Sequence, residues 1–518
     1  MSFRDLLQDP IWKAEELGQA IPPSVHAISV ALPRWQDVVG YEEKQPEVLE
    51  RLLSGYPRFR IHAMVVEVAR QIGKGEPCLP FPSIRVAEAC AEFIRRTSGA
   101  EARVISQEDI HGVVTNAAGN AALLAFWQHT GLIVSSRQAE AHLARGGGRS
   151  LTAPPRRPGS IEAAIPPHPS PLPKERENGP DGGSELHRSL RRQLAGFYDC
   201  AEDDVLLAPT GMAAVFAALK AVMQRTPGRR TAQLGFPYVD SLKLQEKFGH
   251  GAVLLHKLET AGVDLSALLR REPLAGCFCE VPGNPLLGSV DLRAITPALR
   301  EHGVPLVVDD VVATPVNVDL SRHADLIATS LTKFIVGTCD AMGGALICNP
   351  KSPFYNELKP IARAQHEELL FSADALMLDT QARSFPERMK RHNENGRLIA
   401  ERLQRHPAVE RVWYPKWESG EAYEAVRRPS GGWGALVTFL PRNAAARSPV
   451  IYDRLEVCKG PSLGAVFTLA CPFTLLAHYT ELDWAESCGV SRHLIRLSVG
   501  LEEPEDLWGR LERALSEP

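Results

Sequence analysis

Short apolar runs alternate with segments of helical periodicity through the middle of the chain. The sequence predicts strands at 205–208, 231–235, 252–255, 276–281, 305–309, 326–329 and 344–348. Between them, segments such as 212–223 and 241–248 carry apolar residues at helical spacing. Strands separated by helices favour a mostly parallel sheet with helices on both faces, so an α/β fold is predicted. Ligands of such sheets bind at the carboxyl ends of the strands.

The pattern differs on either side of this region. Residues 1–145 are predicted to be mixed and mostly helical, with helices in 61–72 and 85–96, and to contribute to a subunit interface. From about residue 367 a helical stretch runs through 405, and strands follow at 434–440 and 494–499. A last helix is expected from about residue 504 to the end. This part, 367–518, is predicted to be a smaller C-terminal α+β domain, next to a large domain at 186–366.

The segment 146–185 differs from its surroundings because it is crowded with Pro, Gly and charged residues. Such a composition buries too little apolar area to offset chain entropy, so a disordered insertion is predicted. Its clusters Arg156-Arg157 and 174–176 could touch nucleic acid, but a solvated loop is the favoured interpretation.

Composition narrows the classes of function. The 518 residues carry a formal net charge of −4, with 44% hydrophobic and 23% charged residues, as in an ordinary globular protein. Neither nucleic acid nor an anionic membrane is therefore an expected partner. No run of about eighteen apolar residues occurs, and the first ten residues do not resemble a secretory signal, so a cytoplasmic protein is expected.

Cysteine and histidine spacing does not predict a metal site. The ten cysteines include no Cys-x-x-Cys pair, and no two histidines are spaced His-x-x-x-His. Cys277 and Cys279 alternate along a predicted strand and are expected to be buried on one face as small hydrophobic residues.

The strongest chemical signal is Lys333, which follows Ser330 and Thr332 downstream of a strand that ends in Asp309. A lysine amine can condense with an aldehyde, and small hydroxyls can hydrogen-bond a phosphate. An acid can keep a pyridine nitrogen protonated. These groups together predict a site for pyridoxal 5′-phosphate (PLP), whereas Ser-x-Thr-Lys alone would favour a surface lysine.

Other polar residues stand where predicted strands end. The Gly211-Met212 junction between strand and helix could bind a phosphate, or could be a plain tight turn. Tyr238 could stack on a cofactor ring or simply pack in the core. Asn284 could present its amide to the cleft. Arg496, inside an apolar strand, could bind a substrate carboxylate or form an internal salt bridge.

Order and spacing of these motifs resemble the Cys/Met-metabolism PLP enzymes, the transsulfuration group of fold-type I. The resemblance covers roughly 186–518, and the family includes cystathionine γ-synthase, cystathionine lyases and methionine γ-lyase. It is carried by Thr210-Gly211-Met212, Tyr238, Glu280-x-x-x-Asn284-Pro285, the Val-Asp-Asp run around Asp309, Ser330-x-Thr332-Lys333, Ser462-Leu463-Gly464 and the Arg-Leu-Ser-Val-Gly-Leu-Glu run from Arg496. The segment 55–62 is similar to a branch with a long N-terminus that is usually described as cystathionine γ-synthase.

The resemblance implies a role for each matching residue. Lys333 would bind the cofactor covalently and shuttle protons, Asp309 would pair with the pyridine nitrogen, and Tyr238 would stack on the ring. The phosphate would be held by Gly211, Met212, Ser330 and Thr332. Asn284 would face cofactor and substrate, and Ser462 and Arg496 would face the substrate, with Arg496 binding its carboxylate.

Two positions depart from the family pattern. The family uses a Tyr-x-Arg from a neighbouring subunit at the phosphate, and the corresponding place is predicted to be Ser135-Ser136-Arg137, which keeps the arginine but not the tyrosine. Val311 replaces a threonine two residues after the acid. The role of Arg137 implies a homodimer or homotetramer.

The predicted function is γ-replacement on an O-acylhomoserine with cysteine, which gives cystathionine from small amino-acid substrates. A cystathionine or methionine γ-lyase on the same scaffold is the nearest alternative. A catalytically weak PLP-binding regulatory protein is an alternative of another class, motivated by Ser135, Val311 and the insertion.

Overall fold

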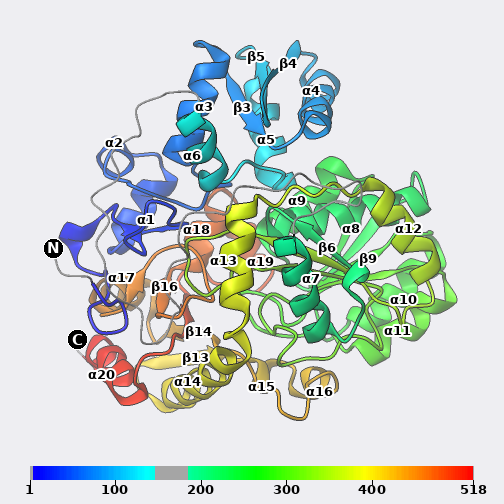
Figure 1. The fold of residues 1–518 in the computed structure, drawn as a ribbon. Helices are drawn as coiled ribbons and strands as arrows, with labels where there is room; N and C mark the ends of the chain where they lie inside the picture. The colour runs from blue at the N-terminus through cyan, green and yellow to red at the C-terminus, as the bar shows by residue number, and fades with distance from the viewer. Residues whose placement is uncertain (1–3, 146–184, 517–518) are drawn as a thin grey trace.

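A computed structural model describes residues 4–145 and 185–516 of the chain. The predicted insertion lies outside the described residues, except for its last residue, Glu185, which begins helix α7. Figure 1 shows a large α/β body, a smaller sheet near the C-terminus, and the segment 63–145 above both, with the first residues of the chain beside the smaller sheet.

The large body is built on a seven-stranded sheet in the order β6-β12-β11-β10-β9-β7-β8. The strands are β6 (Val205–Ala208), β7 (Thr231–Leu234), β8 (Ala252–Leu255), β9 (Cys277–Glu280), β10 (Leu306–Asp309), β11 (Leu326–Ser330) and β12 (Gly344–Cys348). All neighbours pair in parallel except β12, which is antiparallel to β11 and β6. The mostly parallel α/β sheet predicted from the sequence is therefore confirmed.

Alternating side chains bury both faces of this sheet. One face packs on α8 (Gly211–Arg225), α9 (Val239–Phe248) and α12 (Tyr355–Gln365). The other packs on α7 (Glu185–Tyr198), α10 (Ala261–Arg271) and α11 (Leu292–Glu301). Cys277 and Cys279 are buried together on this second face, as expected. Burial on both faces explains why these strands are short continuous apolar runs.

The C-terminal part holds a five-stranded mixed sheet in the order β13-β14-β17-β16-β15. Its strands are β13 (Val409–Trp413), β14 (Leu436–Pro441), β15 (Cys458–Lys459), β16 (Leu469–Cys471) and β17 (Ile495–Ser498). The helices α13 (Ser372–Ala382), α14 (Phe385–Arg405) and α20 (Pro504–Ser516) match the predicted helical segments.

The N-terminal part contains more strand than the sequence suggested. Helices α3 (Ala63–Gly73) and α4 (Ile84–Ser98) lie close to the predicted ranges. They pack with an antiparallel sheet of β3 (Cys78–Phe81), β5 (Ile110–Thr115) and β4 (Ala102–Gln107) that was not predicted. Helices α5 (Asn120–Thr130) and α6 (Ser136–Arg145) follow this sheet, and a short β1–β2 pair (Ala20–Ile21, Ser29–Val30) with helices α1 (Trp35–Glu42) and α2 (Pro46–Leu49) precedes α3.

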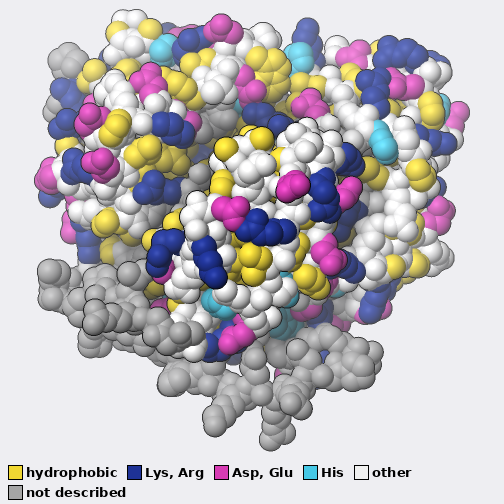
Figure 2. All heavy atoms as spheres, turned by 90° about the horizontal axis from the view of Figure 1, so that it is seen from above, with side chains coloured by type: hydrophobic (Ala, Val, Ile, Leu, Met, Phe, Trp, Pro, Cys, Tyr) yellow, Lys and Arg dark blue, Asp and Glu magenta, His cyan; other side chains and the backbone are white. Residues whose placement is uncertain are grey.

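The surface carries charges of both signs. Seen from above, Lys and Arg side chains are interspersed with Asp and Glu over the visible face (Figure 2). Among the helices of the described residues, none is both long and apolar enough to cross a bilayer.

Candidate active site

Lys333 lies in the loop that follows β11, between the large sheet and the C-terminal sheet. Its Nζ donates to Ser462 Oγ at 3.1 Å and lies 4.4 Å from the centre of the Tyr56 ring. Ser462 comes from the C-terminal part and Tyr56 from the N-terminal part. The lysine amine is thus surrounded by residues from three separate regions of the chain.

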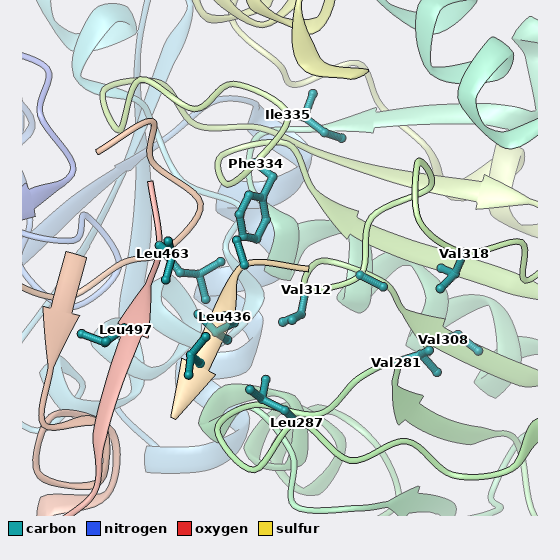
Figure 3. Close-up of a cluster of buried hydrophobic side chains, with 14 of the residues drawn as sticks. Val281, Leu287, Val308, Val312, Val318, Phe334, Ile335, Leu436, Leu463 and Leu497 are labelled. Carbon is teal, nitrogen blue, oxygen red and sulfur yellow. The ribbon is translucent and has the colours of Figure 1, made fainter. Parts of the chain in front are cut away.

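A shared apolar core holds these three regions of the chain in place relative to one another. Figure 3 shows part of one buried hydrophobic cluster, and several of its members are next in sequence to a polar site residue. The pairs are Lys333 and Phe334, Ser462 and Leu463, Arg496 and Leu497, Glu280 and Val281, and Asp309 and Val308. Close packing fixes the backbone at each of these positions. Gly464 lets its backbone pack directly against the loop that holds Lys333. Its φ is +77°, and a Cβ at this position would lie only 2.5 Å from the Phe334 nitrogen.

The N-terminus of α8 offers an anion site beside Ser330. Thr210 caps the helix by accepting from the Ala213 N–H at 3.1 Å. The N–H groups of Gly211 and Met212 precede that capped position, and free N–H groups at a helix start attract anions. The Ser330 hydroxyl is buried and has no hydrogen-bond partner among the described residues. A Cβ on Gly211 would approach Ser330 Oγ to 2.9 Å, so glycine keeps this space open.

These features fit the phosphate of PLP. Two backbone donors, a helix dipole and an unpartnered buried hydroxyl converge where only glycine leaves room.

Thr332 does not offer the free hydroxyl that the sequence predicted for the phosphate. Its hydroxyl donates to the Gly343 carbonyl at 3.2 Å and accepts from the Gly343 N–H at 3.1 Å. Because its single donor is already used, Thr332 has a structural bond here rather than a free phosphate contact.

Two carboxyl groups lie side by side at the ends of β9 and β10. Glu280 and Asp309 are cross-strand partners in the parallel register. Burial, together with the negative charge of Asp309, raises the pKa of Glu280 to about 8. Burial raises the pKa of Asp309 to about 6. The Val311 N–H, which donates to Asp309 Oδ1 at 2.8 Å, opposes this rise only in part. A cation placed next to Asp309 would stabilise its ionised form, and a pyridinium nitrogen is such a cation.

Glu280 also organises its surroundings. Its carboxyl oxygens accept the backbone N–H of Tyr238 and, at 3.2 Å, that of Asn284. One side chain therefore fixes the backbone at two positions that the sequence assigned to the site. In the sequence Glu280 stands out only as part of a motif, without a predicted role of its own.

Arg496 lies on β17 and is buried, with its guanidinium facing the site. Its Nη1 donates to Asn284 Oδ1 at 3.2 Å and its Nη2 to the Ser462 carbonyl at 2.7 Å. Its Nε has no partner among the described residues. Asn284, Ser462 and Arg496 are thus brought together with Lys333, as the sequence predicted, and the free donor suits a carboxylate.

Tyr56 and Arg58 lie at the site but were not among the residues predicted for it. Arg58 is buried, donates through Nη2 to the Tyr238 hydroxyl, and forms an ion pair with Asp240. Burial raises the pKa of Tyr56, but the positive charges of Lys333 and Arg58 outweigh this effect and lower the pKa overall. The signal was present, because Tyr56-Pro57-Arg58 is itself a Tyr-x-Arg sequence.

Arg137 requires a correction. It is buried on α6 and donates to Asp374 Oδ1 at 3.0 Å and to the Asp340 carbonyl at 2.6 Å. A buried arginine bonded in this way to its own chain is not presented to a neighbouring subunit. The Tyr-x-Arg sequence that lies at the site is instead Tyr56-Pro57-Arg58, in which Tyr56 contacts Lys333 and Arg58 contacts Tyr238 within one chain.

Comparison with known proteins agrees with this arrangement. A family model described as Cys/Met metabolism PLP-dependent enzyme matches residues 184–516. A second, described as fungal trans-sulfuration enzyme, N-terminal domain, matches residues 60–135.

Individual relatives differ in their reactions. Cystathionine gamma-synthase of Neurospora crassa is 33% identical over 96% of this chain and 98% of its own. An L-2-amino-4-chloropent-4-enoate dechlorinase/desaturase of Streptantibioticus cattleyicolor is 34% identical over 94% of this chain and 95% of its own. The crystal structure of cystathionine gamma synthase from Xanthomonas oryzae pv. oryzae in complex with cystathionine has a TM-score of 0.58 at 26% identity, covering 73% of this chain and 96% of that one.

Proposed function

Because the chain belongs to the Cys/Met metabolism PLP-dependent enzyme family, we propose that it catalyses γ-replacement on an O-acylhomoserine with cysteine. The observation that carries this proposal is the position of the Lys333 amine, next to Ser462 and close to the Asn284–Arg496 pair. An amino acid could place its carboxylate on Arg496 while its α-carbon lies near Lys333.

PLP bound at such a site delocalises the negative charge that develops on the α-carbon of an amino acid. Gly211, Met212 and Ser330 would hold its phosphate, Asp309 its ring nitrogen, and Tyr238 its ring face. The residues of this chain supply the rest. Arg496 binds and orients the substrate carboxylate, with Asn284 fixing the guanidinium. The Ser462 hydroxyl accepts from the Lys333 amine and aims it.

Proton movement falls to Lys333 and Tyr56. The lysine amine can take the α-proton and return it at a neighbouring carbon. The two cations beside Tyr56 lower the pKa of its hydroxyl, so the phenol can give up a proton more readily than an isolated tyrosine. Both groups lie next to each other, as a proton exchange requires.

The dechlorinase relative favours a second candidate, loss of a γ-substituent without replacement. Its named substrate carries chlorine at carbon 4, the γ position, and its identity to this chain is similar to that of the synthase. We also propose that the protein self-associates as a homodimer or homotetramer, as the family resemblance implies.

The test begins with the visible absorbance of PLP bound to purified protein, which Lys333→Ala should abolish. Turnover is then measured with O-acetyl-, O-succinyl- and O-phosphohomoserine, each with and without cysteine, and with cystathionine alone. Cystathionine formation that depends on cysteine supports replacement. Ammonia and keto-acid release without cysteine would support the elimination alternative, and no turnover with normal PLP binding would favour a regulatory protein.

A further inference from the structure

Asp240 is a carboxylate without exposed surface, at the second position of α9 and two residues after Tyr238. It accepts hydrogen bonds from Arg58 Nη1, from His129 Nδ1 at 3.0 Å and from Gln128 Nε2 at 3.1 Å. A buried charge is costly unless it is fully paired, and this one is. Burial alone would raise the pKa of Asp240, but Arg58 and His129 hold it at about 2, so the group stays ionised.

Arg58 connects this buried charge to the site. The nitrogen Nη1 that bonds Asp240 also donates to the Gln128 carbonyl at 2.7 Å. The other terminal nitrogen donates to the Tyr238 hydroxyl. The guanidinium carbon lies 5.4 Å from the centre of the Tyr56 ring and 5.6 Å from that of Tyr238. Both tyrosines that flank the Lys333 region therefore touch a guanidinium whose orientation Asp240 fixes.

The other two partners of Asp240, Gln128 and His129, come like Arg58 from the N-terminal part of the chain. Gln128 and His129 stand in the last turn of α5, within the residues matched by the fungal N-terminal family model. Helices α5 and α9 pack against each other. This contact therefore links helix α5 to the site through Asp240 and Arg58, in addition to the direct contact that Tyr56 makes with Lys333.

We propose that Asp240 and His129 are positioning residues that act on the cofactor and substrate site through Arg58. This inference rests on the proposed function, since it concerns the same site. The alternative is that Asp240 only neutralises a buried arginine and stabilises the fold, with no effect on the site beyond stability.

A double-mutant cycle separates the two explanations. The dissociation constant of PLP from the apoprotein is measured by fluorescence for the natural protein, Asp240→Asn, Arg58→Ala and the double variant, together with the thermal midpoint of each apoprotein. If Asp240 acts through Arg58, Asp240→Asn should raise the dissociation constant of PLP about tenfold or more in the natural background, because a displaced guanidinium would no longer hold the site residues in place. In the Arg58→Ala background the same change should cost less than about twofold, since interacting residues are not additive.

The proposal would be overturned if Asp240→Asn weakened PLP binding by the same factor with Arg58 present and with Arg58→Ala. An unchanged PLP affinity in Asp240→Asn would overturn it as well. If Asp240→Asn does not fold, His129→Asn keeps the test open, because it removes one donor while leaving the Arg58 pair. It should weaken PLP binding in the natural background only, and an unchanged affinity would overturn the role of His129. Asp264→Asn, an exposed residue on α10, is the matched control. Failure of the natural protein to bind PLP would instead contradict the proposed function.

Discussion

The carboxyl pair at the ends of β9 and β10 predicts an unusual pH dependence of stability. Glu280 is protonated more readily in the folded protein than in the unfolded chain, because burial and Asp309 raise its pKa from 4.5 to about 8. A raised folded pKa contributes stability that is complete below the unfolded pKa and is lost as the pH rises through the folded one. The apoprotein should therefore lose stability from about pH 5 to pH 8 through this group.

The magnitude follows from linkage. Between the two pKa values, one proton contributes about 1.4 kcal/mol per pH unit to the free energy of unfolding. Because Glu280 is already half ionised at pH 8, its contribution falls by about 2 kcal/mol from pH 6 to pH 8. Glu280→Gln keeps the size of the side chain and an acceptor for the Tyr238 N–H but cannot ionise. Relative to the natural protein, the variant should gain about 2 kcal/mol over this range.

The assay is urea unfolding of the two apoproteins at pH 6, 7 and 8 and constant ionic strength, followed by tryptophan fluorescence. Asp309 and Asp310 also have raised pKa values, but both variants contain them, so the difference between the two curves isolates Glu280. Glu246→Gln, an exposed carboxyl on α9, should give a curve parallel to that of the natural protein. Parallel curves for Glu280→Gln as well would refute the reasoning.

Three further outcomes are expected. Arg496→Lys keeps the charge but loses the planar pair of donors, so KM for the amino-acid substrate should rise about tenfold or more in steady-state kinetics while kcat changes less; an unchanged KM would contradict carboxylate binding. Gly464→Ala places a Cβ 2.5 Å from the Phe334 nitrogen at a φ of +77°, so thermal and urea unfolding should show a loss of about 2–4 kcal/mol, and a neutral effect would contradict the close packing described. Because Tyr56 contacts Lys333 and Arg58 contacts Tyr238 within one chain, mixing Arg58→Ala subunits with Lys333→Ala subunits should restore no activity; recovery in mixed oligomers confirmed by mass would show that sites are shared.

Much of the large body could be predicted because its strands are buried on both faces. Such strands are continuous apolar runs that end in polar residues, and the runs ending at Glu280 and Asp309 show both features. The sheet of the N-terminal part was missed because β4 carries exposed Arg103 and other half-exposed residues, so its apolar pattern is weak. The predicted helices beside it have clear amphipathic spacing.

The site was predictable where chemistry and strand ends coincide, as at Lys333, Asn284 and Arg496. Tyr56 and Arg58 are far from Lys333 in sequence, and tertiary packing alone brings them together. The competing Arg137 has the same residue type, but its burial against Asp374 could not be anticipated from sequence spacing.

The division of the site between two sheets has a consequence for how ligands affect the whole molecule. Lys333 and Asn284 follow strands of the large sheet, whereas Ser462 and Arg496 belong to the C-terminal part. A bound amino acid that reaches from Arg496 to Lys333 would add a link between two parts that already share an apolar core and the Lys333–Ser462 and Asn284–Arg496 hydrogen bonds. Its binding energy would stabilise both parts together against unfolding, whereas a simple carboxylic acid without an α-amino group would contact Arg496 alone and stabilise them less.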